Sequence, residues 1–119
     1  MCQWQPPQAV GAVGTLYTGA GVAGGQPAHT LILTNQSRMA AMFGAEATDA
    51  LTAKLRQLAD HPSVNGIVVP LDADPAVSAA YAAWNSDYCR VERANAVAAS
   101  IRDVIRGYVH DPANQIDYL

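Results

Sequence analysis

The chain is poor in charged and bulky aromatic residues. Charged side chains make up 14% of its 119 residues, and there is a single phenylalanine. Alanine dominates the apolar half and buries little area per residue. The expected core therefore depends on a few larger side chains, each contributing roughly 1.5–3 kcal/mol when fully buried. These are Leu31, Ile32, Leu33, Leu51, Leu55, Leu58, Ile67, Val68, Val69, Ile101, Val104 and Ile105.

No cluster of basic residues is present. Seven lysines and arginines are scattered singly and are outnumbered by ten aspartates and glutamates, which leaves a net charge of −3. Binding of nucleic acid through its phosphates requires a concentrated positive surface. The composition therefore predicts no nucleic-acid partner. It also predicts some apolar surface that a protein partner or a second copy of the chain can cover.

The chain has no apolar run that approaches the roughly 18 residues of a membrane span, and its first residues lack the basic and apolar regions of a signal peptide. We therefore expect no membrane association and, by default, a cytoplasmic location. The two cysteines, Cys2 and Cys89, are far apart in the sequence. We interpret them as two unrelated free thiols, with a disulfide between them left open.

Glycine and proline are concentrated in residues 1–28, which we interpret as an arm or linker, with an edge strand as the alternative. Gly19–Gly24 fits the G-x-G-x-x-G pattern of dinucleotide sites. That site requires a firm strand before the glycines and a helix starting directly after them. Here the strong apolar run follows the glycines, so no cofactor site is predicted.

Two continuous apolar runs, residues 29–35 and 66–71, predict strands that are buried on both faces. Two helices are expected between them. The first covers 38–43, with Ser37 as its N-cap and Gly44 at its end. The second covers 48–60, with Thr48 or Asp49 as its cap.

Helical periodicity returns after the second strand. One helix is expected over 75–84, with Asp74 as N-cap and Pro75 in its first turn, and a longer one over 91–109. Residues 116–119 begin a third strand. The order β-α-α-β-α-α-β predicts an α/β fold with three layers (α/β/α), a short and mainly parallel sheet, and a truncated last strand. Residues 29–119 form this domain, which we expect to be incomplete.

Three polar residues follow the predicted strands: Asn35, Asp72 and Asp74. Open α/β sheets bind ligands at this edge, and carboxylates there can hold a hard cation such as Mg²⁺. The favoured interpretation is structural, with Asp74 capping a helix and Asp72 solvated in a loop. The three histidines do not stand at metal-ligand spacing from other ligands. We expect no cofactor, and whether the chain is an enzyme stays open because no complete catalytic constellation is visible.

Seven stretches together resemble the leading α/β portion of bacterial gingipain-like, caspase-like cysteine peptidase domains. They are residues 30–35, 38–44, 55–62, 64–69, 79–84, 94–98 with 101–102, and 116–119. The resemblance implies that the sheet continues beyond the last strand and that the catalytic histidine and cysteine come later. No catalytic residue of that family can be assigned to this chain.

Two functions are therefore expected as alternatives. The first is a non-catalytic subdomain that acts as a scaffold or a partner-binding unit for a peptidase-like domain. The second is a stand-alone α/β module that binds a ligand or a protein and associates with itself through an edge strand. A hydrolase using Asp72 or Asp74 with a metal is a third, less favoured idea.

Overall fold

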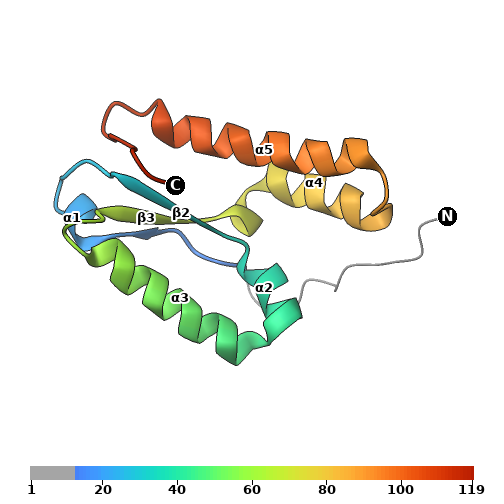
Figure 1. Ribbon diagram of the computed structural model, residues 1–119, viewed down its shortest axis with the longest axis horizontal. Helices are drawn as coiled ribbons and strands as arrows, with labels where there is room; N and C mark the ends of the chain where they lie inside the picture. The colour runs from blue at the N-terminus through green and yellow to red at the C-terminus, as the bar shows by residue number, and fades with distance from the viewer. Residues whose placement is uncertain (1–12) are drawn as a thin grey trace.

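A mixed sheet of three strands forms the middle of the molecule in the computed structural model, which describes residues 13–119 (Figure 1). The strand order is β1-β3-β2. Strand β2 (Thr30–Thr34) runs parallel to β3 (Gly66–Pro70), whereas β1 (Tyr17–Thr18) pairs antiparallel with β3. The expected α/β class is confirmed. The sheet is mixed because part of the glycine-rich segment before β2 supplies its second edge.

Five α-helices accompany this sheet in the described part of the chain. Helices α2 (Gln36–Phe43) and α3 (Ala45–Asp60) connect β2 to β3. A 3₁₀ turn (Leu71–Ala73) then leads into α4 (Pro75–Ser86) and α5 (Val91–Val109), and the short α1 (Ala20–Ala23) follows β1. Figure 1 shows α3 on one side of the sheet and α5 on the other, with α4 lying beside α5.

The main core lies between the two parallel strands and α5. Leu31, Ile67 and Val69 are each at most 6% exposed and form one cluster with Ala28. Partly buried side chains that pack against this cluster come mostly from α5 and the segment after it: Val22, Leu33, Val104, Ile105, Tyr108 and Ile116. The continuous apolar runs of β2 and β3 thus meet helices as expected of parallel strands.

Close packing holds α3 against the other side of β3. Ala59 is fully buried, and a Cβ added to Gly66 would lie 3.2 Å from the Ala59 Cα. Glycine at position 66 therefore lets the helix approach the strand this closely, because any larger residue would push Ala59 away by a few tenths of an ångström. Gly19, the residue before α1, donates its N–H to the Gly66 carbonyl at 2.9 Å. This bond ties the glycine-rich segment to the first residue of β3.

The helix starts between β2 and β3 differ from the prediction. Asn35, and not Ser37, caps α2, because its side-chain oxygen accepts the Arg38 N–H at 3.2 Å. Helix α3 begins at Ala45, directly after Gly44, so neither Thr48 nor Asp49 caps it. Gly44 adopts a φ of 88°, a conformation that glycine permits, and this residue both ends α2 and precedes α3.

The leucines assigned to the core of α3 are largely outside it. Leu51 is 44% exposed and Leu58 is 48% exposed, whereas Thr48 and Ala59 are the buried residues of this helix. The prediction for Leu51 and Leu58 is wrong because the close approach to Gly66 admits only small side chains on the buried face. The helix is rotated so that these two leucines lie at the margin of its buried face.

The segment after α5 returns to the free edge of β2. Thr30 and Tyr118 form an isolated parallel bridge there, and the Leu31 N–H donates to the Tyr118 carbonyl at 3.0 Å. The His29 carbonyl accepts from the N–H groups of Asp117 and Tyr118. The strand expected over residues 116–119 is thus represented by a single bridge.

Candidate functional site

A cavity of about 240 Å³ lies at the carboxyl ends of β2 and β3. Asn35 with the start of α2, the 3₁₀ turn after β3, helix α4 and the segment before β1 form its walls. Parallel α/β sheets bind ligands at this edge because the strand ends and helix starts expose polar groups there. The lining residues are Val13, Asn35, Ser37, Arg38, Asp72, Ser78, Tyr81, Ala82 and Asn85.

Asp72 is the buried acidic group of this cavity, with 9% of its surface exposed. Its Oδ2 accepts the Gly14 N–H at 3.0 Å and the Ser37 N–H at 3.1 Å. Its Oδ1 is buried and has no hydrogen-bond partner among residues 13–119. The interpretation of Asp72 as a solvated loop residue is therefore wrong: the carboxylate joins the segment before β1 to the start of α2.

Arg38 supplies a positive group to the same cavity. Its guanidinium lies 4.9 Å from the ring centroid of Tyr81 and 5.5 Å from that of Trp84. Its Nη1 donates to the Asn85 Oδ1 at 3.0 Å. Within the described chain no carboxylate forms an ion pair with Arg38. Two aromatic rings and the Asn85 amide thus fix the guanidinium, and the bond to Asn85 uses one of its five N–H donors.

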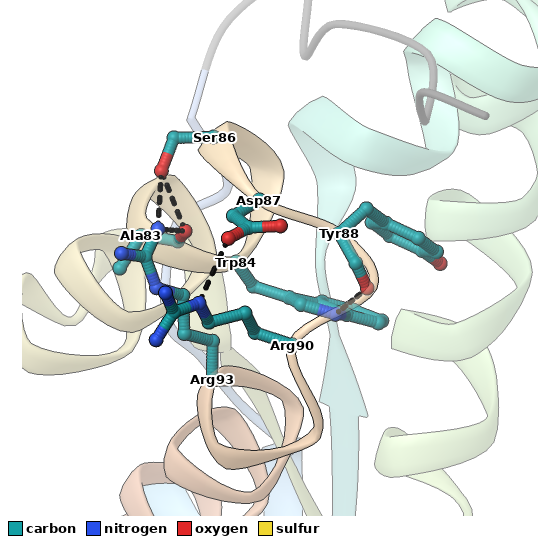
Figure 2. Close-up of polar contacts among 7 residues, drawn as sticks. All are labelled: Ala83, Trp84, Ser86, Asp87, Tyr88, Arg90 and Arg93. Atoms are coloured by element: carbon teal, nitrogen blue, oxygen red, sulfur yellow. Dashed lines mark hydrogen bonds and ion pairs between the residues drawn. The ribbon is translucent and has the colours of Figure 1, made fainter. Parts of the chain in front are cut away.

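The turn between α4 and α5 fixes the aromatic side chain behind Arg38. Trp84 stacks on Tyr88 with a centroid separation of 4.2 Å and donates its Nε1–H to the Tyr88 carbonyl at 2.9 Å (Figure 2). Arg93 donates to the Ala83 carbonyl at 2.8 Å and to the Ser86 hydroxyl, closing the end of α4. The turn therefore fixes the aromatic surface against which Arg38 lies.

The same turn carries Cys89, which is disulfide-bonded. The expectation of a free thiol at this position is wrong. Cys2, the other cysteine, lies outside the described residues. So do the other residues among the first 12 of the predicted arm, which covers residues 1–28.

The structure brings two of the three candidate residues Asn35, Asp72 and Asp74 to the cavity. Asn35 and Asp72 both line the cavity, as their positions after neighbouring strands suggested. Asp74 does not: its Oδ1 accepts the N–H groups of Ala76 and Val77, so it is the N-cap of α4, with Pro75 following it. Among the described residues, no group of three or more acidic, histidine or cysteine side chains is placed to hold a metal ion.

Sequence reasoning did not select Arg38 as a site residue. A single arginine at the start of a short helix has no motif around it, and Tyr81 and Trp84 follow it by more than forty positions. Their spacing on α4 was interpreted as helix packing. Only the fold shows that this packing surface faces a guanidinium.

Comparisons with known proteins yield no relative of this chain: no protein-family model, curated protein or solved structure matches it. The helices of residues 13–119 include none with the length and apolar character needed to cross a bilayer.

Proposed function

We propose that this chain is a non-catalytic α/β scaffold that binds an extended protein segment along the outer edge of β2. With that segment bound, the sheet would have a fourth strand that begins at residues 116–118, in an arrangement of three layers (α/β/α). The observation that carries this proposal is the parallel bridge between Thr30 and Tyr118, which starts a strand pairing that the described chain does not complete.

The direction and register of the bound segment follow from this bridge. Within a strand, the N–H and C=O of successive residues point alternately to opposite neighbours. The Leu31 N–H points outward, to the Tyr118 carbonyl, so the Leu31 carbonyl and both backbone groups of Leu33 also face the open edge. A parallel segment that extends the line of Tyr118 meets these groups in order.

Apolar side chains near this edge favour a bound protein segment over contact with water. Ile32 and Leu33 are only partly buried, although they stand in the middle of β2. Tyr118 and Leu119 are 66% and 71% exposed. An exposed edge with such neighbours is a template for strand addition, and a covering strand would remove both the unpaired backbone groups and the apolar area from water.

The relationship to gingipain-like, caspase-like peptidase domains stays a proposal. It fits a scaffold without its own catalytic residues, and it would assign the β2 edge to the next strand of such a domain. Self-association of a stand-alone module through the same edge is the alternative, because a second copy could also supply the strand.

A chain with six appended residues tests the proposal. A Val/Thr-rich hexapeptide is attached after Leu119, and a control carries proline at the first and third appended positions. Those two N–H groups would face the Leu31 and Leu33 carbonyls, and proline removes them. We expect the Val/Thr extension to raise the free energy of unfolding by about 1–3 kcal/mol, from a few hydrogen bonds of roughly 1 kcal/mol each.

The control extension should leave stability close to that of the original chain. Equal stability of both extended chains and the original would contradict strand binding at this edge. Sedimentation of the original chain separates the alternatives, because self-association predicts a dimer that the Val/Thr extension dissociates by occupying the edge.

A further inference from the structure

An aromatic face runs along α4 and the turn after it, and it consists of Arg38, Tyr81, Trp84 and Tyr88. The ring centroids of Tyr81 and Trp84 are 6.2 Å apart, and those of Trp84 and Tyr88 are 4.2 Å apart (Figure 2). The Arg38 guanidinium lies over the first two rings. All four side chains are only partly buried. A further aromatic side chain can pack on such a face.

The disulfide at Cys89 ends this face and has one candidate partner within the chain. The sequence contains two cysteines, and Cys89 is the only one among residues 13–119. We infer that Cys89 is bonded to Cys2, and that this bond holds residues 3–12 across the aromatic face. The inference is separate from strand binding at the β2 edge and does not depend on it.

The pairing places both ends of residues 3–12 on the same surface. Val13, the residue that follows them, lines the cavity together with Arg38 and Tyr81. Cys89, at the other end, directly follows the last ring of the face. Ten residues can extend over roughly 33–36 Å. The segment is therefore long enough to follow the whole face from the cavity to the disulfide.

The composition of the segment suits this position. Trp4 stands two residues after Cys2, within about 7 Å of chain from the disulfide, which brings its indole within reach of the Tyr88 ring. Pro6 and Pro7 favour an extended backbone over a helix or a compact turn. Residues 1–12 contain no charged side chain, so covering the aromatic face with them buries no charge.

The bond makes the covering of the aromatic face dependent on redox state. It forms when the two thiols each lose one proton and one electron. Glutathione disulfide takes up both protons and both electrons and becomes two glutathione thiols. Reduction of the bond releases Cys2 and removes the tether at one end of residues 3–12.

Peptide mapping tests the pairing. The full chain is oxidised with glutathione disulfide, remaining thiols are blocked, and trypsin digestion without reductant places the cysteines in peptides 1–38 and 57–90. We expect mass spectrometry to find these two peptides joined, and the undigested chain to migrate as a monomer. Recovery of Cys89 as a blocked thiol, as a glutathione adduct or in a dimer joined through this residue would overturn the pairing.

Thermal unfolding provides a second measurement of the same bond. Cys2→Ser and Cys89→Ser should each lower the Tm of the oxidised chain by about 10 °C, as expected when a disulfide that closes a long loop is lost. The double variant should lose no more than either single variant, because all three lack one and the same bond. An unchanged Tm in Cys2→Ser, or additive losses in the double variant, would contradict the pairing.

The covering of the aromatic face is tested by two-dimensional NMR. Trp4→Ala is compared with Gln5→Ala, its matched control, in the oxidised chain and in the Cys2→Ser background. We expect Trp4→Ala to shift the Trp84 Nε1–H and Tyr88 amide resonances several-fold more than the control in the oxidised chain, and no more than the control without the bond. Equal shifts in both backgrounds, or none in the oxidised chain, would overturn the covering even where the disulfide is found.

Discussion

Thr30 and Tyr118 form a parallel bridge although most of the described chain lies between them in the sequence. The bridge places the segment after α5 on the open side of β2, where the Leu31 N–H donates to the Tyr118 carbonyl at 3.0 Å. It sets a direction and a register for any strand that extends the sheet. The proposed scaffold function depends on this one relationship.

The hydrogen bond between Tyr17 and Asp60 predicts a stability loss at alkaline pH. The Tyr17 hydroxyl donates to both carboxylate oxygens, at 2.7 and 2.9 Å, and this bond, together with desolvation and the Asp60 charge, raises the pKa of Tyr17 above its ordinary value of 10.0. A raised pKa means that the folded state holds the proton more tightly. The stabilisation is therefore complete below about pH 10 and is lost as the pH rises through the folded-state pKa.

Urea unfolding of the original chain and of Tyr17→Phe, between pH 8 and 11, measures this loss. The variant should be less stable at pH 8 and should lose less stability above pH 10. Tyr118→Phe is the control, because its side chain is 66% exposed. Parallel pH profiles of the original chain and Tyr17→Phe would show that the hydrogen bond does not stabilise the fold. Tyr108 contributes to both profiles, because burial raises its pKa as well.

Two glycines should respond to alanine in opposite ways. At Gly19 a Cβ would meet the backbone carbonyls of Ala59 and Gly66, so Gly19→Ala should cost roughly 1–3 kcal/mol, as overpacking does. At Gly107, inside α5, nothing lies within 4 Å of an added Cβ, so Gly107→Ala should stabilise by about 0.5–1 kcal/mol. Thermal unfolding of both variants measures this difference, and a loss at Gly107 as large as that at Gly19 would contradict the packing described.

One leucine in β2 and one in α3 should differ strongly in how much they stabilise the fold. Leu31 is 1% exposed, so Leu31→Ala should cost about 2–5 kcal/mol. Leu58 is 48% exposed, and Leu58→Ala should change the free energy of unfolding by no more than about 0.5 kcal/mol. Chemical denaturation of both variants gives the two values. A loss above 2 kcal/mol at Leu58 would place it in the core after all.

The elements with strong local signals were predictable from the sequence. The apolar runs around Leu31 and Val68 predicted the two parallel strands, and Asp74 with Pro75 predicted the start of α4. Helix α5 extends over the predicted residues, Val91–Val109, because its apolar stripe persists through five turns. In each of these, the local pattern and the tertiary packing favour the same structure.

The structure differs from the sequence-based prediction where tertiary packing overrides the local periodicity. Leu51 and Leu58 are in phase on α3, but Ala59 and Gly66 allow a closer approach on another face. The candidate site shows the same limit. Asn35 and Asp72 could be placed at one edge from the strand order, whereas Arg38 required knowledge of which helix lies over it.

Hydrogen exchange at Leu33 tests the open edge of β2 most directly. The Ile32 amide faces β3. The Leu33 amide faces the opposite edge of β2, where no strand of residues 13–119 pairs with it. At low protein concentration we expect Leu33 to exchange roughly tenfold faster than Ile32 or more, and to become protected in the chain that carries the Val/Thr extension. Equal protection of Leu33 and Ile32 in a monomer without the extension would contradict the account.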